Sequence, residues 1–163
     1  MNITLIAAVG KNRELGKDNG LIWYIPEDLK FFKENTMNKQ IIMGMNTLKS
    51  LPRLLPNRKH IVLTRQEVNL DPSVLVVHSV EELLEYLSSV DEEVMVIGGG
   101  QVYSLMIDYA NKLLLTEIDK EFDADVYFPL INSSDWDKEI LSSHNYENME
   151  YSHVAYTRKR EKK

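Results

Sequence analysis

Residues 94–103 read Val-Met-Val-Ile-Gly-Gly-Gly-Gln-Val-Tyr. Four consecutive apolar residues, three of them β-branched, predict a strand covered on both faces, as strands inside parallel sheets are. Glycine at the next three positions permits positive φ and lets a ligand approach the backbone, and a helix from Gln101 onward would point free amide groups at an anion. We therefore predict half of a dinucleotide site here. The alternative is a strand-to-helix turn that needs glycine only for steric reasons.

The glycine spacing differs from the Rossmann fingerprint. That fingerprint needs a third glycine three positions after its second, where the helix packs closely, and an acid about twenty residues further on. Counting from Gly98 and Gly100, the third position holds Tyr103, while Asp119 lies at a suitable distance for the acid. Because a bulky Tyr103 is incompatible with such close packing, we predict that a dinucleotide is held in another way.

The composition is that of an ordinary globular protein. The chain has 163 residues, of which 44% are hydrophobic and 27% charged, so we predict one domain over residues 1–163. A net charge of −6 argues against binding to nucleic acid or to an anionic membrane. Cysteine is absent and the four histidines are scattered, so neither disulfides nor a metal site are expected. We see no basic leader and no apolar run of membrane length, which favours the cytoplasm.

Strands and helices alternate along most of the chain. Apolar runs predict strands at residues 3–9, 40–43, 60–63, 74–77, 94–97 and 112–118, and helices at 26–35, 80–89 and 101–109. Ser79 and Glu82 form a capping box at the start of the second helix. The alternation implies parallel strands with crossover helices on both faces. Residues 136–143 and 151–158 lack an intervening helix signal and are predicted as an antiparallel pair at the sheet edge.

Residues 10–24 are predicted as a long loop that ends in Gly-Leu-Ile-Trp-Tyr. Loops of this length are usually functional or disordered, and the large apolar residues at its end indicate that it closes over a ligand. Pro26 suits the start of the helix that follows. On this helix Asp28 shares a face with Leu29 and Phe32. An acid on an apolar face is unusual, so Asp28 either belongs to a binding site or helps the helix start and points to water.

Residues 44–50, Gly-Met-Asn-Thr-Leu-Lys-Ser, have some likeness to a phosphate-binding P-loop. That motif needs a second glycine directly before the lysine, and Leu48 stands there. A kinase or a nucleotide triphosphatase is therefore not expected.

Short motifs recur along the chain in a definite order. They are Leu5-Ile6-Ala7-Ala8, Leu15-Gly16 through Trp23, Ile25-Pro26-Glu27-Asp28-Leu29-Lys30-Phe31-Phe32, Ile42-Met43-Gly44, Leu55-Pro56-Asn57-Arg58, Val96-Ile97-Gly98-Gly99-Gly100, Tyr103, Leu115-Thr116, Asp125 and Phe128-Pro129. Each motif alone is weak, but their order and separations together are specific. On these motifs the chain resembles, over nearly its whole length, the dihydrofolate reductases of the bacterial chromosomal type.

The resemblance implies a single-domain α/β fold with a mixed, mainly parallel eight-stranded sheet, four flanking helices and antiparallel C-terminal strands. It implies reduction of 7,8-dihydrofolate to 5,6,7,8-tetrahydrofolate by NADPH in one-carbon metabolism, by a monomer that antifolates inhibit. Asp28 would be the acid of the pterin pocket, supported by Thr116. Arg58 would form a bidentate pair with the α-carboxylate of the substrate's glutamate. Gly98 and Gly99 would be joined by a cis peptide at the cofactor.

The site residues that the resemblance implies fall into three sets, and no metal ligand is among them. The catalytic set comprises Asp28, Trp23, Leu21 and Thr116. The substrate-binding set comprises Ile6, Ala7, Asp28, Leu29, Phe32, Leu51, Arg53, Leu55, Arg58, Ile97 and Thr116. The cofactor-binding set, for NADPH, comprises Ala8, Leu15, Gly16, Gly44, Met45, Thr47, Leu63, Thr64, Arg65, Ile97, Gly98, Gly99, Gly100, Gln101, Val102 and Tyr103.

Three positions depart from the family's pattern. The family commonly has an arginine that reaches the cofactor phosphates where this chain has Met45, and a tryptophan three positions later where this chain has Leu48. It also commonly has a proline before the loop tryptophan, where this chain has Ile22. Since the 2′-phosphate of NADPH needs a cation or a hydroxyl opposite it, we expect Arg65 to be the main anchor with Thr64 assisting. His78 is a weaker candidate for the same role.

Two other functions stay open on the sequence alone. A related pterin or pyrimidine reductase on the same fold, such as the reductase of riboflavin synthesis, would not need Asp28 together with Arg58. A nucleotide-binding module without catalysis would bind NADPH but show no oxidation that depends on substrate.

Overall fold

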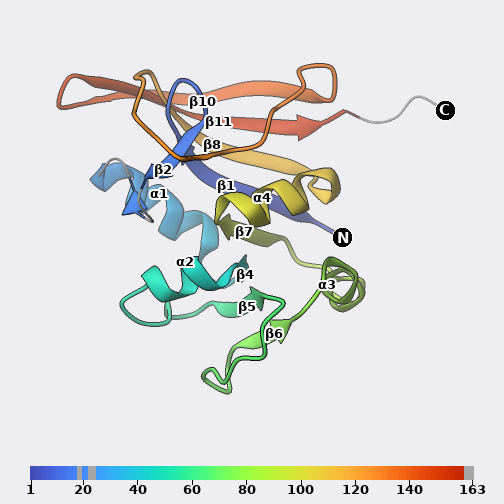
Figure 1. The fold of residues 1–163 in the computed structure, drawn as a ribbon. Helices are drawn as coiled ribbons and strands as arrows, with labels where there is room; N and C mark the ends of the chain where they lie inside the picture. The colour runs from blue at the N-terminus through green and yellow to red at the C-terminus, as the bar shows by residue number, and fades with distance from the viewer. Residues whose placement is uncertain (18–19, 22–24, 160–163) are drawn as a thin grey trace.

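The structure, a computed structural model, describes residues 1–17, 20–21 and 25–159 (Figure 1). The helices are α1 (Pro26–Thr36), α2 (Met45–Ser50), α3 (Val80–Leu87) and α4 (Gly100–Met106), with a 3-10 helix η1 (Ile107–Tyr109) after α4. The strands are β1 (Ile3–Val9), β2 (Glu14–Lys17), β3 (Gly20–Leu21), β4 (Gln40–Met43), β5 (Lys59–Leu63), β6 (Leu75–Val77), β7 (Val94–Gly98), β8 (Lys112–Ile118), β9 (Val126–Tyr127), β10 (Trp136–Tyr146) and β11 (Met149–Arg158). Across these ranges no helix combines the length and apolar character that crossing a membrane needs.

The main sheet has eight strands in the order β10-β11-β8-β1-β7-β4-β5-β6. Neighbours from β8 to β6 pair in parallel, while β11 runs antiparallel to β8 and β10 antiparallel to β11. This confirms the predicted mixed sheet with an antiparallel edge pair. Because β7 lies between β1 and β4, the carboxyl ends of these three strands lie side by side. Open α/β sheets bind ligands at that kind of edge.

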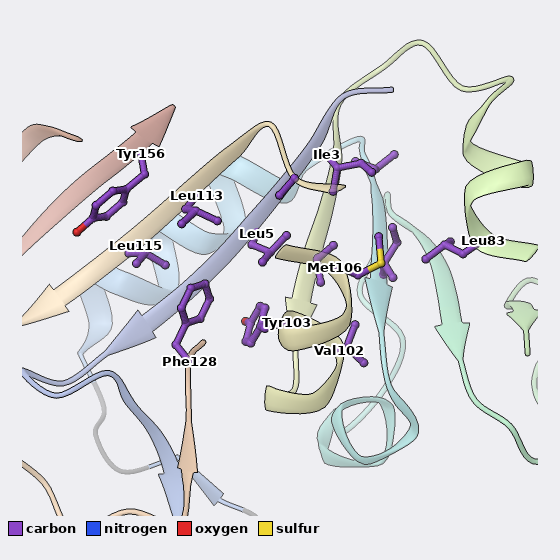
Figure 2. Packing of buried hydrophobic residues seen from close by; sticks show 14 of the residues in the cluster. Ile3, Leu5, Leu83, Val102, Tyr103, Met106, Leu113, Leu115, Phe128 and Tyr156 are labelled. Atoms are coloured by element: carbon purple, nitrogen blue, oxygen red, sulfur yellow. The ribbon is translucent and has the colours of Figure 1, made fainter. Parts of the chain in front are cut away.

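Apolar side chains alternate between the two faces of the sheet, as the period of a strand requires. On β1, Ile3 and Leu5 join a cluster with Leu83 of α3 and Met106 of α4, whereas Ile6 joins a second cluster on the opposite face. That second cluster includes partly buried residues of α1 and α2. Figure 2 shows the first cluster between the sheet and α4. We call these surfaces the α3/α4 face and the α1/α2 face.

Tyr103 fixes the position of α4 relative to the sheet. Its buried hydroxyl donates to the backbone oxygen of Ile6 at 2.6 Å, and its ring lies 5.0 Å from that of Phe128 (Figure 2). Burial raises the pKa of Tyr103 well above its usual range, with a smaller contribution from the charge of Asp28. The hydroxyl therefore stays a donor at every ordinary pH. The side chain that excludes Rossmann packing thus sets the spacing between α4 and β1.

The structure corrects one prediction, the long loop at residues 10–24. There β2 pairs with β3, and β2 also pairs antiparallel with β9, placing Glu14 opposite Tyr127 and Gly16 opposite Val126. The residues of β2, Glu-Leu-Gly-Lys, have little intrinsic strand preference. They are ordered instead by a partner strand far along the chain, which a local sequence pattern cannot reveal.

A buried carboxylate fastens this region to the segment after β8. Glu14 is 1% exposed, and its two oxygens accept hydrogen bonds from the amides of Asn12 and Phe122, each at 2.6 Å. A Cβ on Gly10 would lie 2.7 Å from Glu14 Oε1, so the backbone packs directly against the carboxylate. The turn at residues 10–14 and the segment after β8 therefore share one anchor.

We expect Glu14→Ala to lower the free energy of unfolding by about 1.5–3 kcal/mol, because hydrogen bonds to a charged acceptor are lost inside the protein. Urea unfolding followed by circular dichroism measures this loss. Glu14→Gln is the matched control: its amide oxygen can still accept one bond, so its loss should be smaller. An alanine variant as stable as the parent would show that the carboxylate anchors nothing.

Candidate active site

The turn after β7 is built from glycine and lies against the start of α2. Gly98 has φ of +130°, a conformation that favours glycine, and the peptide joining it to Gly99 is cis, as the resemblance implies. The amide of Gly44 donates to the carbonyl of Gly98 at 3.0 Å. A Cβ on Gly98 would lie 3.4 Å from Thr47 Oγ1. Gly44, Thr47, Gly98 and Gly99, all predicted at the cofactor, are thus brought together at the carboxyl ends of β4 and β7.

Gly100 is needed for a different reason. A Cβ there would meet Val126 Cγ1 at 2.6 Å and come within 3.9 Å of Leu15 Cδ1. The small sheet of β3, β2 and β9 therefore lies directly over the first turn of α4. At this position the steric explanation of the glycine run holds, independent of any ligand.

Asp28 points to the sheet and not to open water. It lies in the first turn of α1, and its Oδ1 accepts a hydrogen bond from the hydroxyl of Thr116. Thr116 is buried in β8, paired with Ala8 of β1 on one side and with His153 of β11 on the other. The side chain of Asp28 is 20% exposed. The alternative in which this acid points to water is therefore excluded.

A histidine that sequence reasoning missed completes this cluster. Nε2 of His153 lies 3.5 Å from Asp28 Oδ1, and the ring stacks on Phe31 with centroids 3.7 Å apart and planes 5° from parallel. The link between His153 and Thr116 is the register of two strands that are far apart in sequence. No local signal could have identified this histidine as a neighbour of Asp28.

Most of the predicted apolar wall gathers on the α1/α2 face. The partly or fully buried residues of this cluster that were predicted to bind substrate are Ile6, Phe32, Leu51, Leu55 and Ile97. The structure places the remaining predicted contacts differently. Leu29 is 50% exposed, Arg53 is exposed, and Ala7 packs on the α3/α4 face, opposite Ile6.

Arg58 is held in one orientation at the end of α1. Its Nε donates to Thr36 Oγ1 at 2.9 Å, and its terminal nitrogens donate to the carbonyls of Pro56 at 2.7 Å and Lys33 at 3.4 Å. Desolvation lowers the pKa of Arg58 from its usual value, yet a guanidinium stays charged in proteins. In these contacts with described residues, each terminal nitrogen of Arg58 donates through one of its two N–H groups. The other N–H of each is left for a planar acceptor.

The predicted 2′-phosphate residues lie at the carboxyl end of β5. The amide of Thr64 donates to Val77 O at 3.0 Å and its carbonyl is 2.8 Å from Nδ1 of His78, so the two strand ends are joined. Arg65 is exposed beside them. Nε2 of His78 lies 3.8 Å from Glu67 Oε1, which occupies the side of the ring that could meet a phosphate.

The other predicted cofactor residues come from several elements. Ala8 lies near the end of β1, Leu63 ends β5, Met45 opens α2, and Gly16 is in β2 of the small sheet. Gln101 and Val102 follow Gly100 in α4, where Gln101 is exposed and Val102 is buried in the cluster of the α3/α4 face. Trp23 and Ile22 fall outside the described residues. Leu21 belongs to β3 by its backbone, and its side chain is likewise outside the description.

A hollow elsewhere in the molecule does not belong to this site. A cavity of about 880 Å³ lies between β1, β8, β10 and β11, with Lys11, Glu117, Asp119 and Lys138 among its lining residues. None of the predicted site residues lines it. The candidate site is thus an open edge of the sheet, shaped by strand ends and α1.

Comparison with known proteins agrees with this arrangement. A family model described as dihydrofolate reductase matches residues 2–160. The chain belongs to the dihydrofolate reductase family. It is 42% identical over 134 residues to the dihydrofolate reductase of Bacillus subtilis, covering 82% of this chain and 79% of that protein. It is 40% identical over 140 residues to that of Haemophilus influenzae, covering 86% of each.

A solved structure has the same fold as this chain. It is the dihydrofolate reductase from Enterococcus faecalis complexed with NADP(H) and RAB-propyl, at 32% identity and a TM-score of 0.89. The match covers 98% of this chain and 97% of that one. The dihydrofolate reductase fold predicted from the sequence is confirmed.

Proposed function

We propose that Asp28 is the acid of the pterin pocket in which this protein reduces 7,8-dihydrofolate to 5,6,7,8-tetrahydrofolate with NADPH. The protein is an NADPH-dependent dihydrofolate reductase. The observation that supports the residue assignment is the carboxylate of Asp28, held by Thr116 near the carboxyl end of β8. A riboflavin-pathway reductase or a non-catalytic module would need neither this acid nor the fixed guanidinium of Arg58.

The residues at the strand ends fit a dinucleotide. Gly44, Gly98 and Gly99 leave bare backbone at the ends of β4 and β7, Thr47 offers a hydroxyl beside them, and Arg65 offers a charge at the end of β5. These groups would hold the pyrophosphate and the 2′-phosphate. The bound cofactor supplies the hydride that reduces carbon 6 of the pterin.

Asp28 would bind and polarise the pterin. Among the described residues, Thr116 and His153 both contact Oδ1, so Oδ2 is left to accept from the amino group and the neighbouring ring nitrogen. The carboxylate's negative field favours protonation of the pterin nitrogen next to carbon 6, with the proton arriving through water. Thr116 would keep the carboxylate from turning away.

The apolar wall orients the rings and excludes water. Ile6, Phe32 and Ile97 lie in one cluster on the α1/α2 face, where a flat aromatic ring can pack without opening the core. Exclusion of water strengthens the field of Asp28 at the reacting atoms. We propose that the segment with Leu21 and Trp23 closes the site when both ligands are bound.

Three further expectations complete the proposal: one domain over residues 1–163, a monomer, and a cytoplasmic location. One continuous eight-stranded sheet supports the first. Light scattering coupled to size exclusion tests the second, and fractionation of cells that express the protein tests the third.

The reaction itself is tested by following NADPH absorbance with and without dihydrofolate. We expect oxidation that requires dihydrofolate and stops when a diaminopyrimidine or diaminopteridine antifolate is added. Binding of NADPH without turnover would instead support the non-catalytic module.

We expect Asp28→Asn to fold normally but to lose about 100-fold or more of its turnover, because the amide keeps the shape and removes the charge. The measurement is kcat for dihydrofolate across neutral pH, with unfolding curves to confirm the fold. A variant that turns over at the parent rate would show that Asp28 is not the pterin acid.

For Arg58→Lys we expect binding of dihydrofolate to weaken by roughly 1–3 kcal/mol, since a bidentate pair becomes a point contact. NADPH affinity should stay unchanged. The control is a pterin substrate without the glutamate, which parent and variant should bind alike. A difference that persists with this substrate would assign Arg58 another role.

Arg65→Ala tests how the chain prefers NADPH to NADH while an apolar Met45 stands at the family's common arginine position. The dissociation constant for NADPH should rise markedly and that for NADH hardly at all, because the 2′-phosphate loses its cation. An exposed pair is screened, so the parent's preference should shrink with added salt. Equal weakening of both cofactors, or of neither, contradicts the assignment.

A further inference from the structure

His153 is a buried imidazole for which the proposed chemistry has no use. The residue is 5% exposed, and its Nε2 has no hydrogen-bond partner among the described residues. This nitrogen points to the carboxylate of Asp28 at 3.5 Å. At that separation the contact is an ion pair when the ring is protonated and a weaker polar contact when the ring is neutral. A buried polar nitrogen normally has a partner, so this one requires an explanation.

Packing holds the ring where it is. Phe31 stacks on one face at 3.7 Å, and the ring of Tyr151 meets it edge-on at 5.7 Å. On the far side, Nδ1 of His153 lies 3.4 Å from Ser142 Oγ, and that hydroxyl lies 2.8 Å from Nε2 of His144. A line of polar groups thus runs from Asp28 through His153 and Ser142 to the half-buried His144 on β10. A half-turn of the ring about Cβ–Cγ would keep the stack but would move Nε2 away from Asp28 and Nδ1 away from Ser142 Oγ, so these two polar contacts select the orientation.

The other charged side chains near His153 line a cavity that borders its ring. This cavity has a volume of about 240 Å³, and the charged residues that line it, all from α1, are Glu27, Lys30 and Glu34. Lys30 Nζ lies 4.0 Å from Glu34 Oε1, so these two largely offset each other. From β11, Tyr151 faces the ring as a neutral phenol, because burial and the charges of Glu27 and Asp28 raise its pKa.

The next strands add no competing charge. On β8 the residue paired with His153 is the uncharged Thr116. The neighbouring Glu117 is engaged on the other side by Tyr156 and by Lys138 Nζ at 3.2 Å. On β10 the facing groups are Ser142 and His144. Asp28 is therefore the carboxylate that a proton on Nε2 would meet.

We propose that His153 is a protonable positioning residue for Asp28, so that the pterin carboxylate of this protein responds to pH through a histidine. With Nε2 protonated, the ring and Thr116 hold Oδ1 from two sides and Oδ2 is presented to the pterin. In the imidazolium form Nδ1–H donates to Ser142 Oγ and Nε2–H faces Asp28 Oδ1. When the ring loses a proton, Nδ1 becomes an acceptor for the hydroxyl of Ser142 and Nε2–H stays toward the carboxylate, so the ion pair with Asp28 is reduced to a weaker contact with a neutral ring. This proposal builds on Asp28 as the pterin acid.

The first test needs no substrate, so its result is independent of the proposed function. Imidazole nitrogens and aspartate carboxyl carbons are followed by NMR against pH in the ligand-free parent, in Asp28→Asn and in His153→Phe. Asp28→Asn should shift the titration of His153 to lower pH, and His153→Phe should shift that of Asp28 to higher pH. Because coupling between two titrating groups is reciprocal, the two shifts should be equal in size.

His144→Phe is the matched control for this test. It keeps an aromatic ring against Tyr151 and removes an imidazole that lies near His153 but does not touch Asp28. The coupling between Asp28 and His153 should survive in this variant. Should Asp28→Asn leave the His153 titration where it was, the proposal is overturned, whether or not His153→Phe can be purified in folded form.

The second test asks whether the contact matters to the reaction. His153→Phe keeps the stack on Phe31 but lacks a donor, and we expect KM for dihydrofolate to rise roughly threefold to tenfold, the scale of one polar contact to a carboxylate. His153→Gln keeps a neutral donor, so KM should return toward the parent value while the pH profile of kcat loses the inflection due to the histidine. A merely structural role predicts lower stability in both variants with the parent's pH profile, and that result would count against the proposal.

Discussion

The hydrogen bond between Thr116 and Asp28 is the contact on which the site depends. It joins a helix that begins after β3 to a strand near the middle of the sheet, and the pairing of β8 with β1 and β11 fixes where Thr116 lies. The carboxylate therefore takes its position from four elements that are distant in sequence. Apolar packing on the α1/α2 face supplies the surroundings, but this one polar contact turns an acid on an exposed helix toward the sheet.

Local sequence patterns predicted much of the fold. Continuous apolar runs located the central strands close to their observed bounds, and Ser79 caps α3 by accepting from the amide of Glu82 at 3.0 Å. The second half of that capping box differs, because the carboxylate of Glu82 accepts from the amide of His78, one residue earlier. Pairing of β2 with β9 could not be predicted, since the residues of β2 have little strand preference and β9, Val126–Tyr127, is only two residues long.

The same division applies to the site. In the sequence, Asp28 stands out because an acid on an apolar helix face is unusual, and the glycines because they follow a buried strand. Gly98 proves to need glycine for its backbone angle, and Gly100 for the nearness of Val126. His153 could not be predicted as a neighbour of Asp28, because the contact arises from the register of β11 against β8. Met45 packs with the apolar cluster of the α1/α2 face, which explains why that position accepts a residue unable to meet a phosphate.

The place of β11 in the sheet also bears on the order in which the protein can be made. As the chain leaves the ribosome, β1 emerges first, yet its neighbours on both sides, β7 and β8, follow much later, and β11 later still. Such long-range pairing delays folding, because loop closure must precede the contacts that repay it. Until residue 153 has been synthesised, Asp28 faces an unfinished sheet edge. A nascent chain that already contains Asp28 and the glycine turn therefore still lacks the strand that completes the surroundings of this carboxylate.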